Sequence, residues 1–134
     1  MKEREIEIAV DGDIAVGGIL QTPEHPIAAY LFAHGAGAGM RHAFMERFAA
    51  QLADRSIATL RYNFPYMQQG GRRPDRKPLL HATVRAAART LSTEFADIPR
   101  FAGGKSMGGR MTSEAQSVEA LVGVRGIAFV GFPL

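Results

Sequence analysis

Cysteine is absent from the 134-residue sequence. Its absence excludes disulfide bonds, a thiolate nucleophile and zinc sites built on cysteine. Long apolar runs are missing too, because none approaches the roughly 18 residues that a membrane-spanning helix requires. Charged side chains dominate residues 1–8, where a signal peptide would be apolar. We therefore expect a cytoplasmic protein that makes no contact with a membrane.

The sequence also lacks a concentrated block of charge of one sign. The formal net charge is +3, and the charges are interspersed except in residues 72–77, which are mostly basic. We interpret that segment as a solvated loop, because it has neither the helix nor the aromatic residues of a nucleic-acid surface. No nucleic-acid partner is expected. Hydrophobic residues make up 46% of the chain, which predicts a single globular domain over residues 1–134.

Hydropathy patterns predict alternating strands and helices after an N-terminal hairpin. Residues 6–10 and 14–20 flank Asp11 and Gly12, a dipeptide typical of hairpin turns. Short apolar runs then predict buried strands, and runs with one apolar face predict amphipathic helices. The predicted strands are residues 28–33, 57–62, 101–103 and 126–132, the predicted helices are 42–55, 80–95 and 107–116, and residues 63–66 are predicted as a loop.

This order of elements indicates an α/β fold, with a mostly parallel sheet and helices on both faces. In such sheets, binding sites form where the parallel strands end. The glycine-rich loop 34–39, the loop after residue 62 and the turn at 104–108 all follow predicted strands. We therefore expect these segments to converge on one crevice.

Residues 104–106, Gly-Lys-Ser, are similar to the end of a phosphate-binding loop. That loop requires G-x-x-x-x-G-K-[ST] after a strand, but Pro99 replaces its first glycine and residues 93–98 have the pattern of a helix end. The loop 34–39 is not a dinucleotide fingerprint either, because Met40 stands where the third glycine is required. We therefore expect no nucleotide or other cofactor, and no metal site.

Residues 104–108 also match G-x-S-x-G, the elbow that presents a nucleophilic serine between a strand and a helix. A predicted short strand precedes the motif and a predicted helix follows it, as the elbow requires. Ser106 is therefore the predicted nucleophile of a serine hydrolase. Backbone N–H groups must stabilise the developing oxyanion, and we predict those of Met107 and Ala36, with Gly37 as the next candidate after Ala36.

Five blocks of sequence occur in order, at residues 34–40, 61–66, 72–74, 103–110 and 131–134. Together they resemble a small family of α/β-hydrolase-fold proteins. This family is related to the dienelactone hydrolases and includes the hydrolase-like domain of a subunit of the nonspecific-lethal chromatin complex. The resemblance implies an eight-stranded, mostly parallel sheet and a Ser–Asp–His triad that hydrolyses a small ester-like substrate. It places Ser106 at the nucleophile and Met107 and Ala36 at the oxyanion positions.

The second half of that triad is missing after Ser106. In this fold an acid and then a histidine follow the nucleophile, but the only later carboxylates are Glu114 and Glu119, in or just after the next predicted helix. We therefore expect the chain to lack the C-terminal strands and helix of the fold, and to be impaired as a hydrolase. All the histidines precede the serine, at His25, His34, His42 and His81.

His34 is expected to pack or hydrogen-bond within its loop and not to act as a base. An incomplete sheet would leave residues 126–132 as an edge strand, and such edges pair readily with other chains. Self-association through that edge is therefore expected. The alternative function is that of a non-catalytic hydrolase-fold module that acts through protein contacts, as the chromatin-complex relative suggests.

Overall fold

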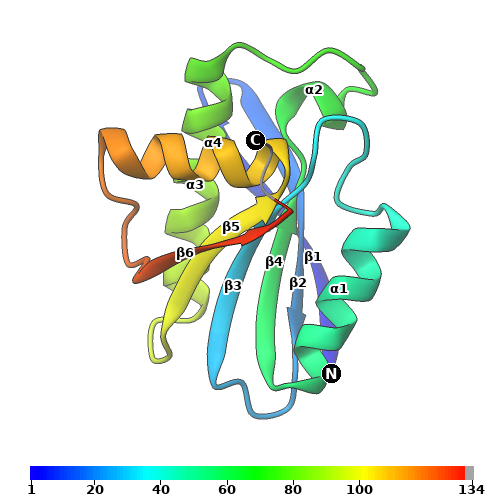
Figure 1. Ribbon diagram of the computed structural model, residues 1–134, viewed down its shortest axis with the longest axis vertical. Coiled ribbons are helices and arrows are strands. Elements are labelled where there is room, and N and C mark those ends of the chain that lie inside the picture. The colour runs from blue at the N-terminus through cyan, green and yellow to red at the C-terminus, as the bar shows by residue number, and fades with distance from the viewer. Residues whose placement is uncertain (132–134) are drawn as a thin grey trace.

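The computed structural model describes residues 1–131, which form a six-stranded sheet in the order β1-β2-β4-β3-β5-β6 (Figure 1). β2 pairs antiparallel with both β1 and β4, whereas β4, β3, β5 and β6 run parallel. The strands are β1 (Lys2–Asp11), β2 (Ile14–Thr22), β3 (Ala28–Ala33), β4 (Ile57–Tyr62), β5 (Arg100–Lys105) and β6 (Gly126–Val130), and the helices are α1 (Ala43–Asp54), α2 (Pro65–Gln68), α3 (Lys77–Glu94) and α4 (Met107–Val118).

Helices cover both faces of this sheet, which confirms the predicted α/β architecture (Figure 1). On one face, Met45 of α1 forms a buried cluster with Tyr30 and Phe32 of β3. On the other face, Leu31 belongs to the larger core that includes residues of α3 and α4. Successive strand residues point to opposite faces, so the fully apolar β3 supplies both layers, as a buried parallel strand should.

The segment after β4 differs from its predicted structure. Pro65–Gln68 form the short helix α2, where only a loop was predicted. Pro65 occupies the first turn of α2, where its fixed φ and missing N–H suit the start of a helix. The described residues contain six strands, whereas the family resemblance implies eight. Residues 132–134, which end the last predicted strand and the last matching block, lie outside the described residues.

The parallel strands β3, β4 and β5 end together at one edge of the sheet. Ala33 at the end of β3 pairs in register with Tyr62 of β4 and with Gly104 of β5. The loop 34–39, the segment after residue 62 and the turn at 104–108 therefore meet there. This convergence was predicted from the alternation of strands and helices alone.

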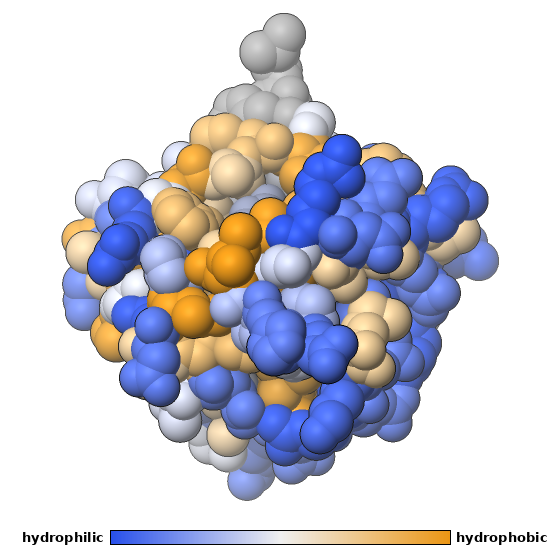
Figure 2. Space-filling view, turned by 90° about the horizontal axis from the view of Figure 1, so that it is seen from below, coloured by the Kyte–Doolittle hydropathy of each residue, from blue (hydrophilic) through white to orange (hydrophobic). Residues whose placement is uncertain are grey.

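The opposite end of the molecule, where β3, β4 and β5 begin, shows apolar side chains among polar ones (Figure 2). Ile27, just before β3, and Phe101, at the start of β5, are 65% and 36% exposed. An apolar groove of about 290 Å³ also runs beside β6, with Phe48 and Ala128 among its lining residues.

None of the helices formed by residues 1–131 is long and apolar enough to cross a membrane.

Candidate active site

Ser106 lies between β5 and α4 in a backbone conformation that residues with a side chain rarely adopt. Its φ is 53° and its ψ is −115°, values that glycine adopts easily because it has no Cβ. Such strain costs on the order of 1–3 kcal/mol and persists only where surrounding contacts hold it. The Ser106 N–H donates to the Gly131 carbonyl at 2.7 Å, and the Ser106 carbonyl accepts from the Arg110 N–H at 3.1 Å. The turn therefore has the geometry of a nucleophile elbow.

Gly104 and Gly108 allow β3, β5 and α4 to approach one another around this elbow. A Cβ on Gly104 would lie 2.6 Å from the Ala33 carbonyl oxygen. A Cβ on Gly108 would overlap the His34 carbonyl oxygen and lie 2.7 Å from the Ala33 Cβ. These neighbours are backbone atoms or a side chain with no rotatable bond, so they cannot move aside. Packing against the end of β3 therefore requires both glycines of the motif.

The loop that follows β3 passes beside the serine, and hollows lie on both sides of it. A Cβ on Gly35 would lie 3.8 Å from the Ser106 Cβ. We name one of them the first hollow. It has a volume of about 350 Å³ and is lined by residues 35–38, His42, Met45, Lys105 and Ser106. What we call the second hollow has a volume of about 340 Å³, and its lining includes Ala36, Asp75, Lys77, Ser106, Met107 and Arg110.

The structure brings the predicted site residues together. Ser106 and Ala36 border both hollows, and Met107 borders the second. Within residues 1–131, neither the Ala36 N–H nor the Met107 N–H donates a hydrogen bond. Both N–H groups therefore have no hydrogen-bond acceptor among the described residues. Gly37, the next candidate, borders the first hollow.

Tyr66 fixes the peptide plane between Ala36 and Gly37. Its hydroxyl donates to the Ala36 carbonyl at 2.8 Å, and in a trans peptide the Gly37 N–H then points the opposite way. The Tyr66 N–H donates to Asp75 Oδ2 at 3.0 Å. Burial, with the nearby Asp75 charge, raises the pKa of Tyr66 to about 12, so the hydroxyl keeps its proton near neutral pH. Sequence analysis did not single out Tyr66 or Asp75, although Tyr66 belongs to the matching block 61–66.

His34 has a structural position, as the sequence predicts. Its Nδ1 lies 2.6 Å from the Gly35 carbonyl oxygen, and its Nε2 accepts from the Phe64 N–H at 3.0 Å. The ring is fully buried and edge-on to Phe64, and burial lowers the pKa of His34. Both ring nitrogens are engaged and the neutral form is favoured, so His34 is not placed to take a proton from Ser106.

A second histidine, His42, borders the first hollow, and the sequence analysis did not place it there. His42 precedes α1, and its Nδ1 accepts from the Phe44 N–H at 3.2 Å. A neutral imidazole that accepts at Nδ1 carries its proton on Nε2. Neither nitrogen can therefore accept a proton from Ser106 while this helix cap is in place. The position of His42, three residues after the loop 34–39, is the signal that could have suggested its nearness to the site.

The later carboxylates lie elsewhere. Glu114 Oε1 lies 3.1 Å from His81 Nε2 and 3.4 Å from Lys77 Nζ, and these contacts join α3 to α4. Neither Glu114 nor Glu119 lines the first or second hollow. Within the part of the chain that the structure describes, no side chain hydrogen-bonds to the Ser106 hydroxyl, and no cluster of His, Asp and Glu could hold a metal ion.

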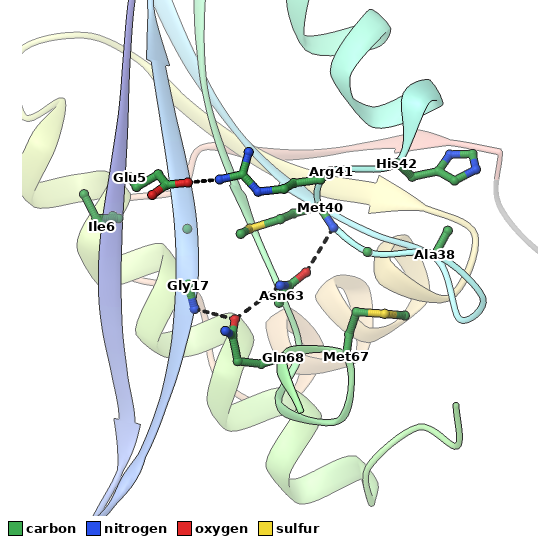
Figure 3. Close-up of a pocket in the computed structure, with 12 residues that line it drawn as sticks. Glu5, Ile6, Gly17, Ala38, Met40, Arg41, His42, Asn63, Met67 and Gln68 are labelled. Atoms are coloured by element: carbon green, nitrogen blue, oxygen red, sulfur yellow. Dashed lines mark hydrogen bonds and ion pairs between the residues drawn. The ribbon is translucent and has the colours of Figure 1, made fainter. Parts of the chain in front are cut away.

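A larger cavity, of about 650 Å³, shares Ala38 and His42 with the first hollow. It lies between β2, the loop after β3 and α2, as Figure 3 shows. Amide groups brace its wall, because Gln68 Oε1 accepts from the Gly17 N–H at 2.8 Å and from Asn63 Nδ2 at 3.2 Å (Figure 3). This cavity therefore adjoins the first hollow, which borders Ser106.

A mostly parallel sheet that presents a strained serine between a strand and a helix is the arrangement of the α/β-hydrolase fold. Sequence comparison agrees with this class. Residues 26–134 match the family described as alpha/beta hydrolase domain, and the chain belongs to this family. Comparison with curated proteins gives no match.

Solved structures show the same fold at low sequence identity. A dienelactone hydrolase from Anabaena variabilis has a TM-score of 0.81 and 21% identity, over 98% of this chain and 63% of that one. A carboxyl esterase from Bacillus coagulans has a TM-score of 0.79 and 16% identity, over 96% and 44%. An α/β serine hydrolase without a lid from Xanthomonas campestris has a TM-score of 0.73 and 17% identity, over 87% and 56%. The chain thus spans less than two thirds of each of these proteins.

Proposed function

We propose that the protein is a serine hydrolase that acts on ester-type bonds of a small molecule, with Ser106 as its nucleophile. The observation that carries this proposal is the strained backbone of Ser106 at the junction of β5 and α4. The fold maintains this costly conformation beside hollows that a ligand can enter. The names of similar structures, a dienelactone hydrolase and a carboxyl esterase, support ester-type chemistry.

In the proposed reaction, Ser106 Oγ attacks the carbonyl carbon of the substrate. A carbon–oxygen bond forms, and the carbonyl π electrons move onto the oxygen, which becomes an oxyanion. The free N–H groups of Met107 and Ala36 would donate to that oxygen. Loss of one such donor typically lowers kcat by about 10²–10³. The alcohol then leaves with a proton, and water hydrolyses the acyl-serine.

The hydroxyl proton must go to a base during the attack. Within residues 1–131, neither His34 nor His42 has a nitrogen free to receive it. We therefore propose that the chain with this sequence is impaired as a hydrolase. Removing the histidine of a complete triad lowers kcat by about 10⁶, and a residual rate of roughly 10³–10⁴ over water comes from the oxyanion site and binding.

A fluorophosphonate probe tests the role of Ser106 independently of turnover. We expect slow labelling that is lost in Ser106→Ala and kept in Ser113→Ala, a matched change on α4. A short p-nitrophenyl ester should be hydrolysed far more slowly than by a homologue with a complete triad. Labelling that survives in Ser106→Ala would contradict the assignment of the nucleophile, and turnover near that of the homologue would contradict the impairment.

The second candidate function is a non-catalytic module that acts through protein contacts. It is favoured by the lack of a base near Ser106 in the described residues. The matching blocks of sequence also suggest it, because the family that they resemble includes a domain of a subunit of the nonspecific-lethal chromatin complex. This function predicts that the folded protein resists the fluorophosphonate probe even after long incubation. Labelling specific to Ser106 would instead favour the hydrolase.

A further inference from the structure

The first hollow carries an unpaired positive charge next to the proposed nucleophile. Lys105 is the last residue of β5 and lines this hollow beside Ser106. No Asp or Glu lines the hollow, and within residues 1–131 Lys105 makes no ion pair. Several other cations of the chain have carboxylate partners, such as Arg4 with Glu94 and Lys77 with Glu114. The charge at Lys105 is therefore available to a ligand.

An aromatic ring restrains the Lys105 side chain. Its Nζ lies 5.2 Å from the centroid of the Phe44 ring, in the first turn of α1. In this cation–π contact the face of the ring attracts the ammonium group electrostatically. The contact reduces the rotamer freedom that a lysine otherwise loses when it binds an anion. The ammonium group is thus held over a ring of α1, the helix whose Met45 lines the hollow together with Lys105.

The remaining lining of the hollow suits a small anionic group. His42 accepts the Phe44 N–H at Nδ1, which leaves Nε2–H as a donor when the ring is neutral. Residues 35–38 contribute backbone and only small side chains. The volume of about 350 Å³ lies in the range of roughly 300–1,000 Å³ that is usual for small-molecule sites.

We propose that the substrate bears a carboxylate, which Lys105 binds in the first hollow while the ester carbonyl lies at Ser106. This proposal rests on the proposed function. The substrate class is then a short ester with a free carboxylate a few bonds away, such as a monoester of a small dicarboxylic acid. Because the hollow is open to solvent, the ion pair is partly screened and its contribution is modest. Lys105 sets specificity and takes no part in bond making.

The test compares glutarate with its neutral analogue glutaramide by NMR titration of the purified chain. We expect glutarate to shift signals of residues 35–38 and 104–106, and glutaramide to bind more weakly. Lys105→Met should raise the Kd for glutarate about three- to fivefold, whereas Lys105→Arg should keep it within about twofold. Lys2→Met removes the same charge from distant β1 and should leave the Kd unchanged. An unchanged Kd in Lys105→Met, or equal binding of both ligands, would overturn the proposal.

Two further arms separate alternative sources of binding. Inorganic phosphate that binds more tightly than glutarate would also overturn the assignment of a carboxylate. Ser106→Ala should keep glutarate binding, since the carboxylate contact does not involve the hydroxyl. If the fluorophosphonate probe does not label the protein but glutarate binding depends on Lys105, only the assignment of the nucleophile is refuted. Ser106-dependent labelling without glutarate binding would refute the carboxylate site alone.

Discussion

Replacing Ser106 with glycine should stabilise the protein while it removes the proposed nucleophile. The strain at φ 53° and ψ −115° costs on the order of 1–3 kcal/mol, and glycine avoids most of it. The greater freedom of glycine in the unfolded chain costs about 0.5–1 kcal/mol. The expected net gain in the free energy of unfolding is therefore about 0.5–2 kcal/mol. Ser106→Ala keeps a Cβ in the same conformation and should change it by less than about 0.5 kcal/mol.

Urea unfolding followed by circular dichroism measures these differences. Ser56→Gly is a matched control, because Ser56 also has a positive φ, 63°, but lies between α1 and β4. It should stabilise the fold and leave probe labelling intact. Ser113→Gly lies inside α4 and should destabilise by about 0.5–1 kcal/mol. A Ser106→Gly variant no more stable than Ser106→Ala would refute the argument that the fold stores strain at the elbow.

Three further outcomes follow from packing, burial and the sheet edge. Gly108→Ala should destabilise the fold by about 3 kcal/mol or more, because its Cβ would overlap the His34 carbonyl. Gly37→Ala should be nearly neutral, because its Cβ would meet nothing within 4 Å. Equal urea midpoints for the two variants would contradict this packing argument. Burial lowers the pKa of His34 in the folded protein, so its contribution to the free energy of unfolding should be complete above the pKa of the unfolded chain, about 6.5. Below that pH the free energy of unfolding should fall by up to about 1.4 kcal/mol per pH unit. Urea titrations at several pH values should show this slope, and the slope should be flatter in His34→Gln. β6 lies at the edge of the described sheet beside an apolar groove, and such edges pair with other chains. Light scattering should therefore detect concentration-dependent self-association, which Phe101→Glu should reduce. A monomer at high concentration would count against this prediction.

Much of the architecture could be predicted because its signals are local. The alternation of polar and apolar residues predicted the hairpin, and a fully apolar run predicted β3. The elbow was also predictable, because G-x-S-x-G reports a packing requirement at Gly104 and Gly108 that holds wherever a helix follows the strand so closely. Local patterns therefore located Ser106 and the loop that borders it.

Other features depend on contacts between segments that are far apart in the sequence. The Tyr66 hydroxyl reaches Ala36, which is 30 residues earlier, and no periodicity records such a contact. His42 and Lys105 meet at one hollow only because the start of α1 lies beside the elbow. The helix α2 was missed because its four residues are too few to show a helical period.

Two of the hydrogen bonds of Tyr66 have a mechanical consequence. Its N–H holds Asp75 in the basic loop that follows α2, and its hydroxyl holds Ala36 beside the serine. One residue of α2 therefore contacts both loops, through its backbone N–H on one side and its side-chain hydroxyl on the other. A displacement of the basic loop that shifts Tyr66 would therefore also shift the hydroxyl contact with the peptide that borders the nucleophile.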